Sequence, residues 1–431
     1  MSILIFYLLT ILSIIICVDL CRIEWRRRSP FIVFWLTLIA VVFLPSLFDP
    51  FRGIVYPHVF AASIVITENL LIKYSVFVFV VMLFFRLMYV VYDQLFFRRV
   101  CSPLSMHLEE KDGLAVYFYV GMIFASLFAF YEVYRTFGIG FVSGFGFEER
   151  RNGLSLVSGF LLSYSYMVSA GLGLWFFVKR QYSRFILILA FFTAAYLLFG
   201  GSRQPLVAFF IPLLLYPAMG RKKRSALILV IMLGSAVLFS DILNALLYLR
   251  NLPSFSERLE LIMDLPRLMT EATSREGGEG MVRYAFYYYL ESARYIDGYF
   301  HFEYLSRFLL FWLPSGLDFF HIKPDDFEYF MFAQYMTGHV GTMHPTVFGS
   351  IYADSGWFFI PWAFLLSLLL YFLPLYIQRF TGLIYVCLWS TICFYSLMLA
   401  RGSLYGSAVV IFFSILFALL INFIAKVRMS K

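Results

Sequence analysis

Long apolar runs recur along the whole chain, and they constrain its fold more than any other feature of the sequence. Many of these runs hold about 17 to 25 residues, the length that an α-helix needs to cross the hydrocarbon core of a bilayer. The composition agrees, since 62% of the residues are hydrophobic and only 14% are charged. Backbone exposed to lipid must satisfy its own hydrogen bonds, so we expect these spans to be helical. The sequence therefore predicts an all-α fold, a polytopic membrane helical bundle.

About eleven runs are long enough to span a bilayer. They cover residues 2–20, 30–48, 71–91, 113–134, 155–177, 184–200, 205–220, 225–242, 355–377, 383–400 and 404–425. The first run has no small-residue cleavage site after it, which indicates a retained span and not a signal peptide. Residues 54–67 are apolar but short and contain Pro57 and His58. They predict a re-entrant or interfacial element, or alternatively a twelfth span.

Basic residues gather in short segments between the spans. These clusters are residues 22–28, 98–99 with Lys111, 178–184, 221–224, Arg379 and 426–431. Short basic loops face the cytoplasm, and the predicted spans put all of these clusters on one side. The pattern predicts a multi-pass protein with an outer N-terminus and a cytoplasmic C-terminus. It also explains the net charge of +8 by topology, without a nucleic-acid partner.

Sequence motifs for cofactors are missing. The five cysteines form no CxxC pair and have no histidine nearby, which argues against zinc and against disulfides. His339 and His344 have no third metal ligand at a suitable spacing. The chain also lacks a Walker A loop and the GxGxxG, GxSxG and HExxH patterns. We therefore predict neither a metal nor any other cofactor.

Several arginines are predicted to lie on the outer side, against the usual charge bias. Arg203 and Arg401 each fall in a short turn about one span away from cytoplasmic clusters, and Arg135, Arg150 and Arg151 follow the fourth span. Arginines in such places are candidates for binding an anionic group. A single arginine at a helix end is equally suited to contact lipid phosphate.

A long polar segment separates the first eight or so spans, in residues 1–242, from the last three, in residues 351–431. This segment, residues 243–350, is predicted to be a large outer loop with amphipathic helices. Residues 255–272, interrupted by Pro266, suit a helix on the membrane surface. Residues 279–300 predict a second helix.

Arg283 and Arg294 lie eleven residues apart on that second helix, so they share a face, and Arg275 precedes them. Intrahelical ion pairs, such as Glu279 with Arg283, are the alternative role for these side chains. The tyrosines of this helix, Tyr287 among them, suit either an interfacial belt or stacking on sugar rings.

His344 lies beside the last spans and is the leading candidate for a general base. Nearby arginines lower the pKa of a histidine and keep it neutral, as a base requires. A hydrogen-bonded turn residue is the alternative interpretation of His344. Asp354 and Glu291 are further candidates for the base.

Three segments together resemble a known family. They are "FGGSRQPLVAFF", with Arg203; "HPTVFGSIYADSGWFFIPWAFLL", which starts at His344; and "ARGSLYG", with Arg401. With the large late loop, they resemble the bacterial O-antigen and repeat-unit polysaccharide polymerases of the Wzy type, which are similar in architecture to the O-antigen ligases. In the related ligases a histidine precedes a glycine in the segment that enters a span. His344 and Gly356 match these positions, although the ligases have Asn where Pro345 follows.

The resemblance implies a glycosyltransferase of the bacterial inner membrane with its active site on the periplasmic side. Such an enzyme moves a growing chain from undecaprenyl pyrophosphate to the next lipid-linked oligosaccharide, so both donor and acceptor are lipid-linked and lie in the bilayer. The family also implies a flippase and a chain-length regulator in the same membrane. An O-antigen ligase and a non-catalytic transporter or flippase are the alternatives. The transporter predicts charges at mid-membrane depth, whereas Lys73 and Arg86 lie near helix ends, where they can reach the interface.

The chemistry implied by the resemblance assigns roles to the candidate residues. A departing pyrophosphate is anionic and needs positive charge beside it. The forked donors of arginine match phosphate oxygens. The predicted catalytic residues are His344, Arg203 and Asp354. The predicted substrate-binding residues are Arg283, Arg294, Arg401, Arg275, Arg151, Glu291 and Tyr287.

Overall fold

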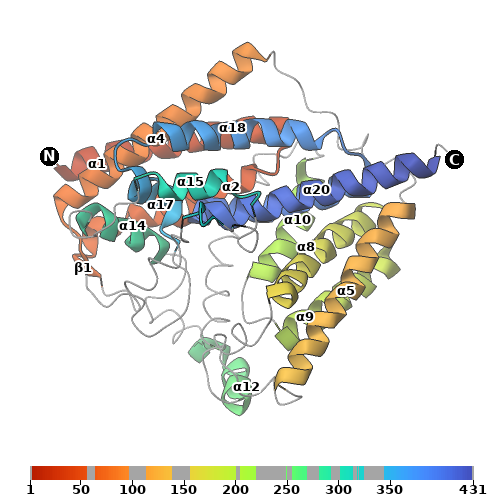
Figure 1. Ribbon diagram of the computed structural model, residues 1–431. Helices are drawn as coiled ribbons and strands as arrows, with labels where there is room; N and C mark the ends of the chain where they lie inside the picture. The colour runs from red at the N-terminus through yellow and green to blue at the C-terminus, as the bar shows by residue number, and fades with distance from the viewer. Residues whose placement is uncertain are drawn as a thin grey trace. The chain divides into compact units, whose positions relative to one another are not determined.

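The computed structural model describes residues 2–55, 64–96, 113–137, 156–199, 204–219, 249, 255–268, 281–292, 301–313, 318, 320–324 and 344–429. Within these ranges the chain is almost entirely helical (Figure 1). The described residues contain one sheet, and it has only two short strands. The prediction of an all-α bundle is confirmed.

Six described helices are long and apolar enough to cross a membrane, which makes this a multi-pass membrane protein. They are α1 (Ser2–Arg27), the run Ile32–Phe51, α4 (Glu68–Leu95), α18 (Ile360–Ile377), α19 (Gly382–Arg401) and the part Leu404–Ile424 of α20 (Leu404–Met429). Apolar residues also fill α5 (Gly113–Phe137), α8 (Leu156–Val178), α9 (Tyr182–Phe199) and α10 (Gln204–Met219). All of these helices coincide with predicted spans. The predicted span at 225–242 lies outside the described residues.

The second span is irregular. It consists of α2 (Ile32–Thr37), a π-helical stretch η1 (Leu38–Phe43), α3 (Leu44–Ser46) and a 3-10 turn η2 (Asp49–Phe51). Proline has no N–H to donate and clashes with the carbonyl of the preceding turn. The π-helical stretch lies just before Pro45, so we attribute the widened turn to that proline.

The short apolar segment at 54–67 is not a twelfth helical span. Its two ends form strands β1 (Ile54–Val55) and β2 (Ile64–Val65), which pair antiparallel with Ile54 opposite Val65. A continuous helix cannot include residues that pair in this way. Of the predicted alternatives, only the re-entrant or interfacial element is compatible with this pairing.

The remaining described helices are short. They are α12 (Phe255–Met263), α14 (Met281–Ser292), α15 (Glu303–Leu309) and α17 (Thr346–Ser355). The predicted interruption at Pro266 appears one turn early, because α12 ends at Met263. The predicted helix at 279–300 is described only as α14, and its last eight residues lie outside the described ranges.

The chain divides into two compact units, which we describe separately. The first unit contains residues Met1–Cys101, Glu276–Tyr376 and Tyr395–Phe412. The second contains Ser102–Arg275, Ile377–Phe394 and Phe413–Lys431. In the second unit α8 packs against α5, α9 and α10.

In the first unit, α1, α4 and α18 are tied together near the ends at which they terminate. The guanidinium of Arg27 donates to the carbonyl of Tyr371 at 2.6 Å and lies 4.0 Å from the centre of its ring. The hydroxyl of Tyr371 donates to Asp93 at 2.7 Å. These contacts bring the end of α1, which carries the basic cluster at 22–28, beside the end of α18, which Arg379 follows.

Arg86 of α4 pairs with Asp19 of α1 at 2.6 Å. Both side chains of this ion pair remain partly exposed, so the pair links the two spans without burying either charge.

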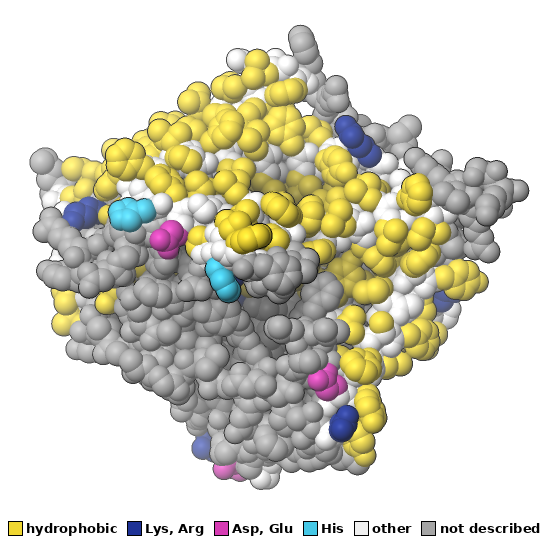
Figure 2. All heavy atoms as spheres, in the orientation of Figure 1, with side chains coloured by type: hydrophobic (Ala, Val, Ile, Leu, Met, Phe, Trp, Pro, Cys, Tyr) yellow, Lys and Arg dark blue, Asp and Glu magenta, His cyan; other side chains and the backbone are white. Residues whose placement is uncertain are grey.

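The exposed faces of these spans are mostly apolar. On α1 the exposed residues Leu4, Leu8, Ile11, Ile15 and Val18 recur at helical spacing, so they form one stripe. Figure 2 shows hydrophobic side chains gathered over α4 and α18, where Leu83, Leu87 and Phe364 are exposed. Such a surface is suited to lipid.

Candidate functional site

Helix α17 organises the region that contains two of the predicted site residues. It begins directly after Pro345, a position that tolerates proline because no hydrogen bond within the helix needs an N–H there. All ten residues of α17 are buried. His344 precedes Pro345 and is half-buried. At the first turn the N–H of Gly349 donates to the side chain of Thr346 at 3.2 Å. The start of α17 is therefore fixed within the core of the first unit.

The turn between α19 and α20 packs directly on α17. Gly402 has φ +107°, which other residues rarely adopt, and a Cβ there would lie 2.7 Å from the carbonyl oxygen of Thr346. The hydroxyl of Ser350 donates to the carbonyl of Gly402 at 3.0 Å. Arg401, which is half-buried, directly precedes this glycine. The contact thus brings the Arg401 turn and the His344 segment together.

Asp354, near the other end of α17, lies in a different environment from the one predicted. Its carboxylate accepts hydrogen bonds from the backbone N–H groups of Tyr304 (2.9 Å) and Leu305 (3.1 Å) and from the indole of Trp362 (2.7 Å). Asp354 is only 1% exposed. Its carboxylate therefore caps the first turn of α15, where the free N–H groups of a helix need acceptors. A general base must reach a substrate hydroxyl, so this geometry favours a supporting role over a catalytic one.

Burial raises the pKa of Asp354 from its ordinary value of 3.8 to about 6, although its three hydrogen-bond donors oppose the shift and Glu303 adds to it. The folded protein then holds this proton more tightly than the unfolded chain does. The contribution to stability is full below pH 3.8 and is lost as the pH rises through 6.

We therefore expect wild-type protein to lose about 2 to 3 kcal/mol of this contribution across that window, whereas Asp354→Asn shows a flatter dependence. Thermal unfolding of both proteins in detergent between pH 4 and 7 measures the difference. Parallel curves would show that Asp354 does not titrate there.

Tyr304 connects α15 to the start of α20. Its hydroxyl accepts the N–H groups of Leu404 at 3.2 Å and Tyr405 at 3.3 Å, and its ring centre lies 5.4 Å from that of Trp362. The side chain of Tyr304 thus accepts the first N–H groups of α20, while the backbone N–H of Tyr304 donates to Asp354.

Two cations lie against Tyr405, in the first turn of α20. The guanidinium carbon of Arg307 is 4.4 Å from the centre of the tyrosine ring, and the ammonium of Lys323 is 4.5 Å from it. Lys323 also contacts the hydroxyl of Tyr405. These residues were not predicted from the sequence, because Arg307 and Lys323 lie in no recognisable motif and only Tyr405 falls within the "ARGSLYG" segment.

Arg283, predicted to bind substrate, is held by a carboxylate instead. Its Nε and Nη2 donate to the two oxygens of Asp49 at 2.7 and 2.8 Å, and Tyr287 donates to the same carboxylate at 2.6 Å. Arg283 is 1% exposed and Asp49 is fully buried. Burial lowers the pKa of Arg283, but Asp49 and Tyr287 together raise it above its ordinary value, so the guanidinium stays charged. Arg283 and Tyr287 therefore have a structural role: they connect α14 to Asp49 at the end of the second span.

The other tyrosines of α14 also differ from the prediction. Tyr284 and Tyr289 are buried with Tyr287 in the core of the first unit, so they form neither an exposed belt nor an open platform for sugars. Glu291 is exposed near the end of α14 and is not brought to His344 by any described contact. Four predicted residues lie outside the described residues: Arg203, Arg294, Arg275 and Arg151.

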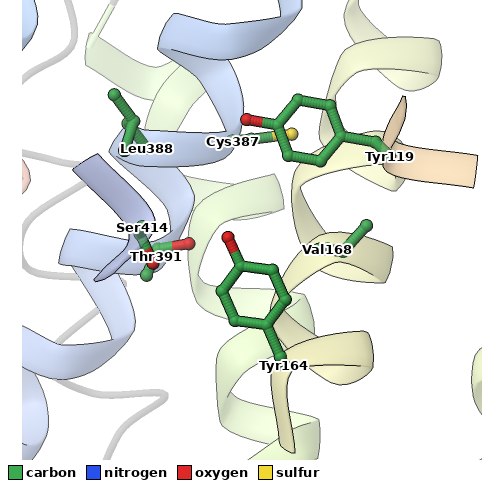
Figure 3. A pocket seen from close by; sticks show the side chains of 7 residues that line it. All are labelled: Tyr119, Tyr164, Val168, Cys387, Leu388, Thr391 and Ser414. Carbon is green, nitrogen blue, oxygen red and sulfur yellow. The ribbon is translucent and has the colours of Figure 1, made fainter. Parts of the chain in front are cut away.

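A small polar cavity occurs in the second unit (Figure 3). The hydroxyls of Tyr119 and Tyr164 point toward Cys387 of α19 and Ser414 of α20, respectively, and Val168, Leu388 and Thr391 complete the described lining. This lining contains no charged side chain, and the space does not admit a water molecule. It contains none of the predicted site residues, so it offers no second candidate site.

Among the residues that the structure describes, no three His, Cys, Asp or Glu side chains gather as a metal site would require. No protein family model, curated protein or solved structure matches this chain. The functional interpretation consequently depends on the segments that meet at α17 and on the chemistry of their side chains.

Proposed function

We propose that this chain is an integral membrane glycosyltransferase of the Wzy type, which joins undecaprenyl-pyrophosphate-linked oligosaccharides at the periplasmic face of the bacterial inner membrane. One observation carries the proposal: Gly402 packs on Thr346 and Ser350, so a histidine segment and an arginine turn that are distant in sequence meet. A general base and a cation beside one another are what glycosyl transfer with a pyrophosphate leaving group requires.

In the proposed reaction, a sugar hydroxyl of the incoming lipid-linked unit attacks the anomeric carbon of the growing chain. His344 takes the hydroxyl proton. The new glycosidic bond forms as the bond between the anomeric carbon and the pyrophosphate oxygen breaks, and the electron pair leaves with undecaprenyl pyrophosphate. Arg401 stabilises the charge that develops on this leaving group. Arg203 remains a proposed second donor to the pyrophosphate.

The positions of the basic clusters support an outer site. Arg27 contacts Tyr371 near the end of α18, whereas α17 lies directly before the start of α18, as Figure 1 shows. Eleven residues separate Ile360 from Tyr371, which corresponds to roughly 16 Å along the helix, and the chain reaches the Arg379 cluster further on. Because basic clusters face the cytoplasm, the His344 segment belongs at the opposite, outer surface.

The decisive test is polymer formation by purified protein. We expect wild-type protein in nanodiscs, given its undecaprenyl-pyrophosphate repeat unit and a chelator, to produce a ladder of polymers on a gel. His344→Ala is expected to reduce the rate by about 10²- to 10⁴-fold, because a positioned general base contributes that much. Arg184→Ala, in the exposed first turn of α9 where Arg184 donates to Gln181, is the matched control and should retain the ladder.

The absence of a ladder from folded wild-type protein with its native substrate would remove the polymerase proposal. The next assay would then offer preformed polymer and lipid A core. Transfer of the polymer to the core would identify a ligase, and movement of the lipid across the bilayer without bond formation would identify a transporter.

A further inference from the structure

We infer that Asp354 and Tyr304 are positioning residues of the proposed reaction, because together they fix the first turn of α20 and the arginine turn before it. This inference rests on the proposed function for its catalytic consequence. Its structural part, a connection from α17 through α15 to α20, stands on hydrogen bonds between the described residues.

The first step of the connection is the capping of α15 by Asp354. α15 has no side-chain cap of its own: Phe302, at its N-cap position, has the left-handed φ of 65°. Asp354, fifty residues later in the chain, supplies acceptors for two of the first N–H groups of α15 through its two carboxylate oxygens. The indole of Trp362 donates to the same carboxylate and fixes its orientation. The position of α15 therefore depends on α17.

The second step is the capping of α20 by Tyr304. The first N–H groups of a helix have no partner within the helix. Two of them, from Leu404 and Tyr405, converge on the hydroxyl of Tyr304, which arrives from α15. A Tyr hydroxyl at this place determines where α20 begins, and hence where Arg401 stands three residues earlier.

Two additional contacts reinforce the connection. Arg307 lies three residues after Tyr304 on the same face of α15, and its guanidinium lies over the ring of Tyr405. On the other side, Ser350 of α17 holds the carbonyl of Gly402. The turn that carries Arg401 is thus held from α15 and from α17, and both helices are joined by Asp354.

Hydrogen exchange measured by mass spectrometry tests the connection without reference to activity. Tyr304→Phe keeps the aromatic ring but removes the acceptor, so we expect faster exchange in peptides that cover Leu404 and Tyr405. Asp354→Asn should accelerate exchange at Tyr304 and Leu305 and also at the start of α20, which Asp354 does not touch. Tyr92→Phe, which removes a buried hydroxyl bonded to Ser367, is the matched control and should leave α20 unchanged.

The polymerisation assay tests the positioning role. We expect Tyr304→Phe to lower kcat by about 10- to 100-fold, as small displacements of a catalytic group do, with little change in the KM for the lipid-linked substrate. Tyr92→Phe should keep both constants. A merely structural role would instead reduce the amount of folded protein and leave the kcat of the folded fraction intact.

The outcomes separate this inference from the proposed function. Unchanged exchange at the start of α20 in Tyr304→Phe would overturn the connection, whatever the activity. Faster exchange with a wild-type kcat would overturn the positioning role while the polymerase stands. If folded wild-type protein makes no polymer, the proposed function and the catalytic consequence fail together. The hydrogen-exchange result then decides only whether the structural connection from α17 to α20 exists. Tyr304→Phe keeps the test valid should Asp354→Asn fail to fold.

Discussion

Replacement of Arg401 by alanine is expected to slow polymer formation by about 10²- to 10³-fold, the typical cost of losing one positioned electrostatic donor. Arg401 ends α19 directly before Gly402, whose backbone contacts the first turn of α17. The turn that carries Arg401 is thus held beside the His344 segment, where the leaving pyrophosphate is proposed to lie. The measurement is the initial rate of ladder formation per unit of folded protein in nanodiscs.

A lysine at position 401 provides a second comparison. Lysine keeps the positive charge but lacks the planar fork that binds two phosphate oxygens at once, so Arg401→Lys should retain more activity than Arg401→Ala and less than wild type. Arg184→Ala again controls for the loss of an exposed arginine. An Arg401→Ala enzyme within a few-fold of the wild-type rate would exclude Arg401 from the pyrophosphate clamp.

Replacement of Arg283 by alanine is expected to lower the free energy of unfolding by about 3 to 5 kcal/mol, because it removes the buried countercharge of Asp49 and leaves only the partly exposed Arg52 nearby. Asp49 is fully buried, and two nitrogens of Arg283 occupy its two oxygens. Tyr287 would remain as a hydrogen-bond donor to the carboxylate, and the guanidinium of Arg52 lies 3.9 Å from it. Thermal or denaturant unfolding in detergent measures the loss.

The double variant Asp49→Leu with Arg283→Met separates charge burial from packing. Replacing a buried ion pair by apolar residues is often neutral or stabilising, so the double variant should recover most of the stability that Arg283→Ala loses. Arg267→Ala is the control, since Arg267 and Glu260 are more than half exposed and their pair contributes at most about 1 kcal/mol. If the Arg283→Ala protein has normal stability but makes no polymer, the structural role is wrong and Arg283 is again a candidate for substrate binding.

Much of the fold was accessible from the sequence because its determinants are local. The apolar runs predicted α1, α4, α18, α19 and α20 with small errors at the ends. The helix α17, which begins after Pro345, was not predicted, because it is too short and too mixed in composition to read as a span. The segment at 54–67 was ambiguous, because a short apolar run satisfies a helix and a strand equally well until its partner is known.

The candidate site was only partly predictable. His344 and Arg401 were singled out from their own segments, but nothing local indicated that Gly402 rests on Thr346. Arg307 and Lys323 escaped notice because their common partner, Tyr405, lies far along the chain. Asp354 was predicted as a candidate general base, whereas its carboxylate caps a helix that begins about fifty residues earlier in the chain.

The sequence by itself determined that this is a multi-pass helical membrane protein, because the length and polarity of each span depend only on consecutive residues. The tertiary structure decided what the charges do. Arg283 and Glu279 were adjacent candidates for an intrahelical pair, whereas the partner of Arg283 proved to be Asp49, 234 residues away. A buried charge requires a countercharge wherever the chain can deliver one, and only the packing of distant helices specifies which residue that is.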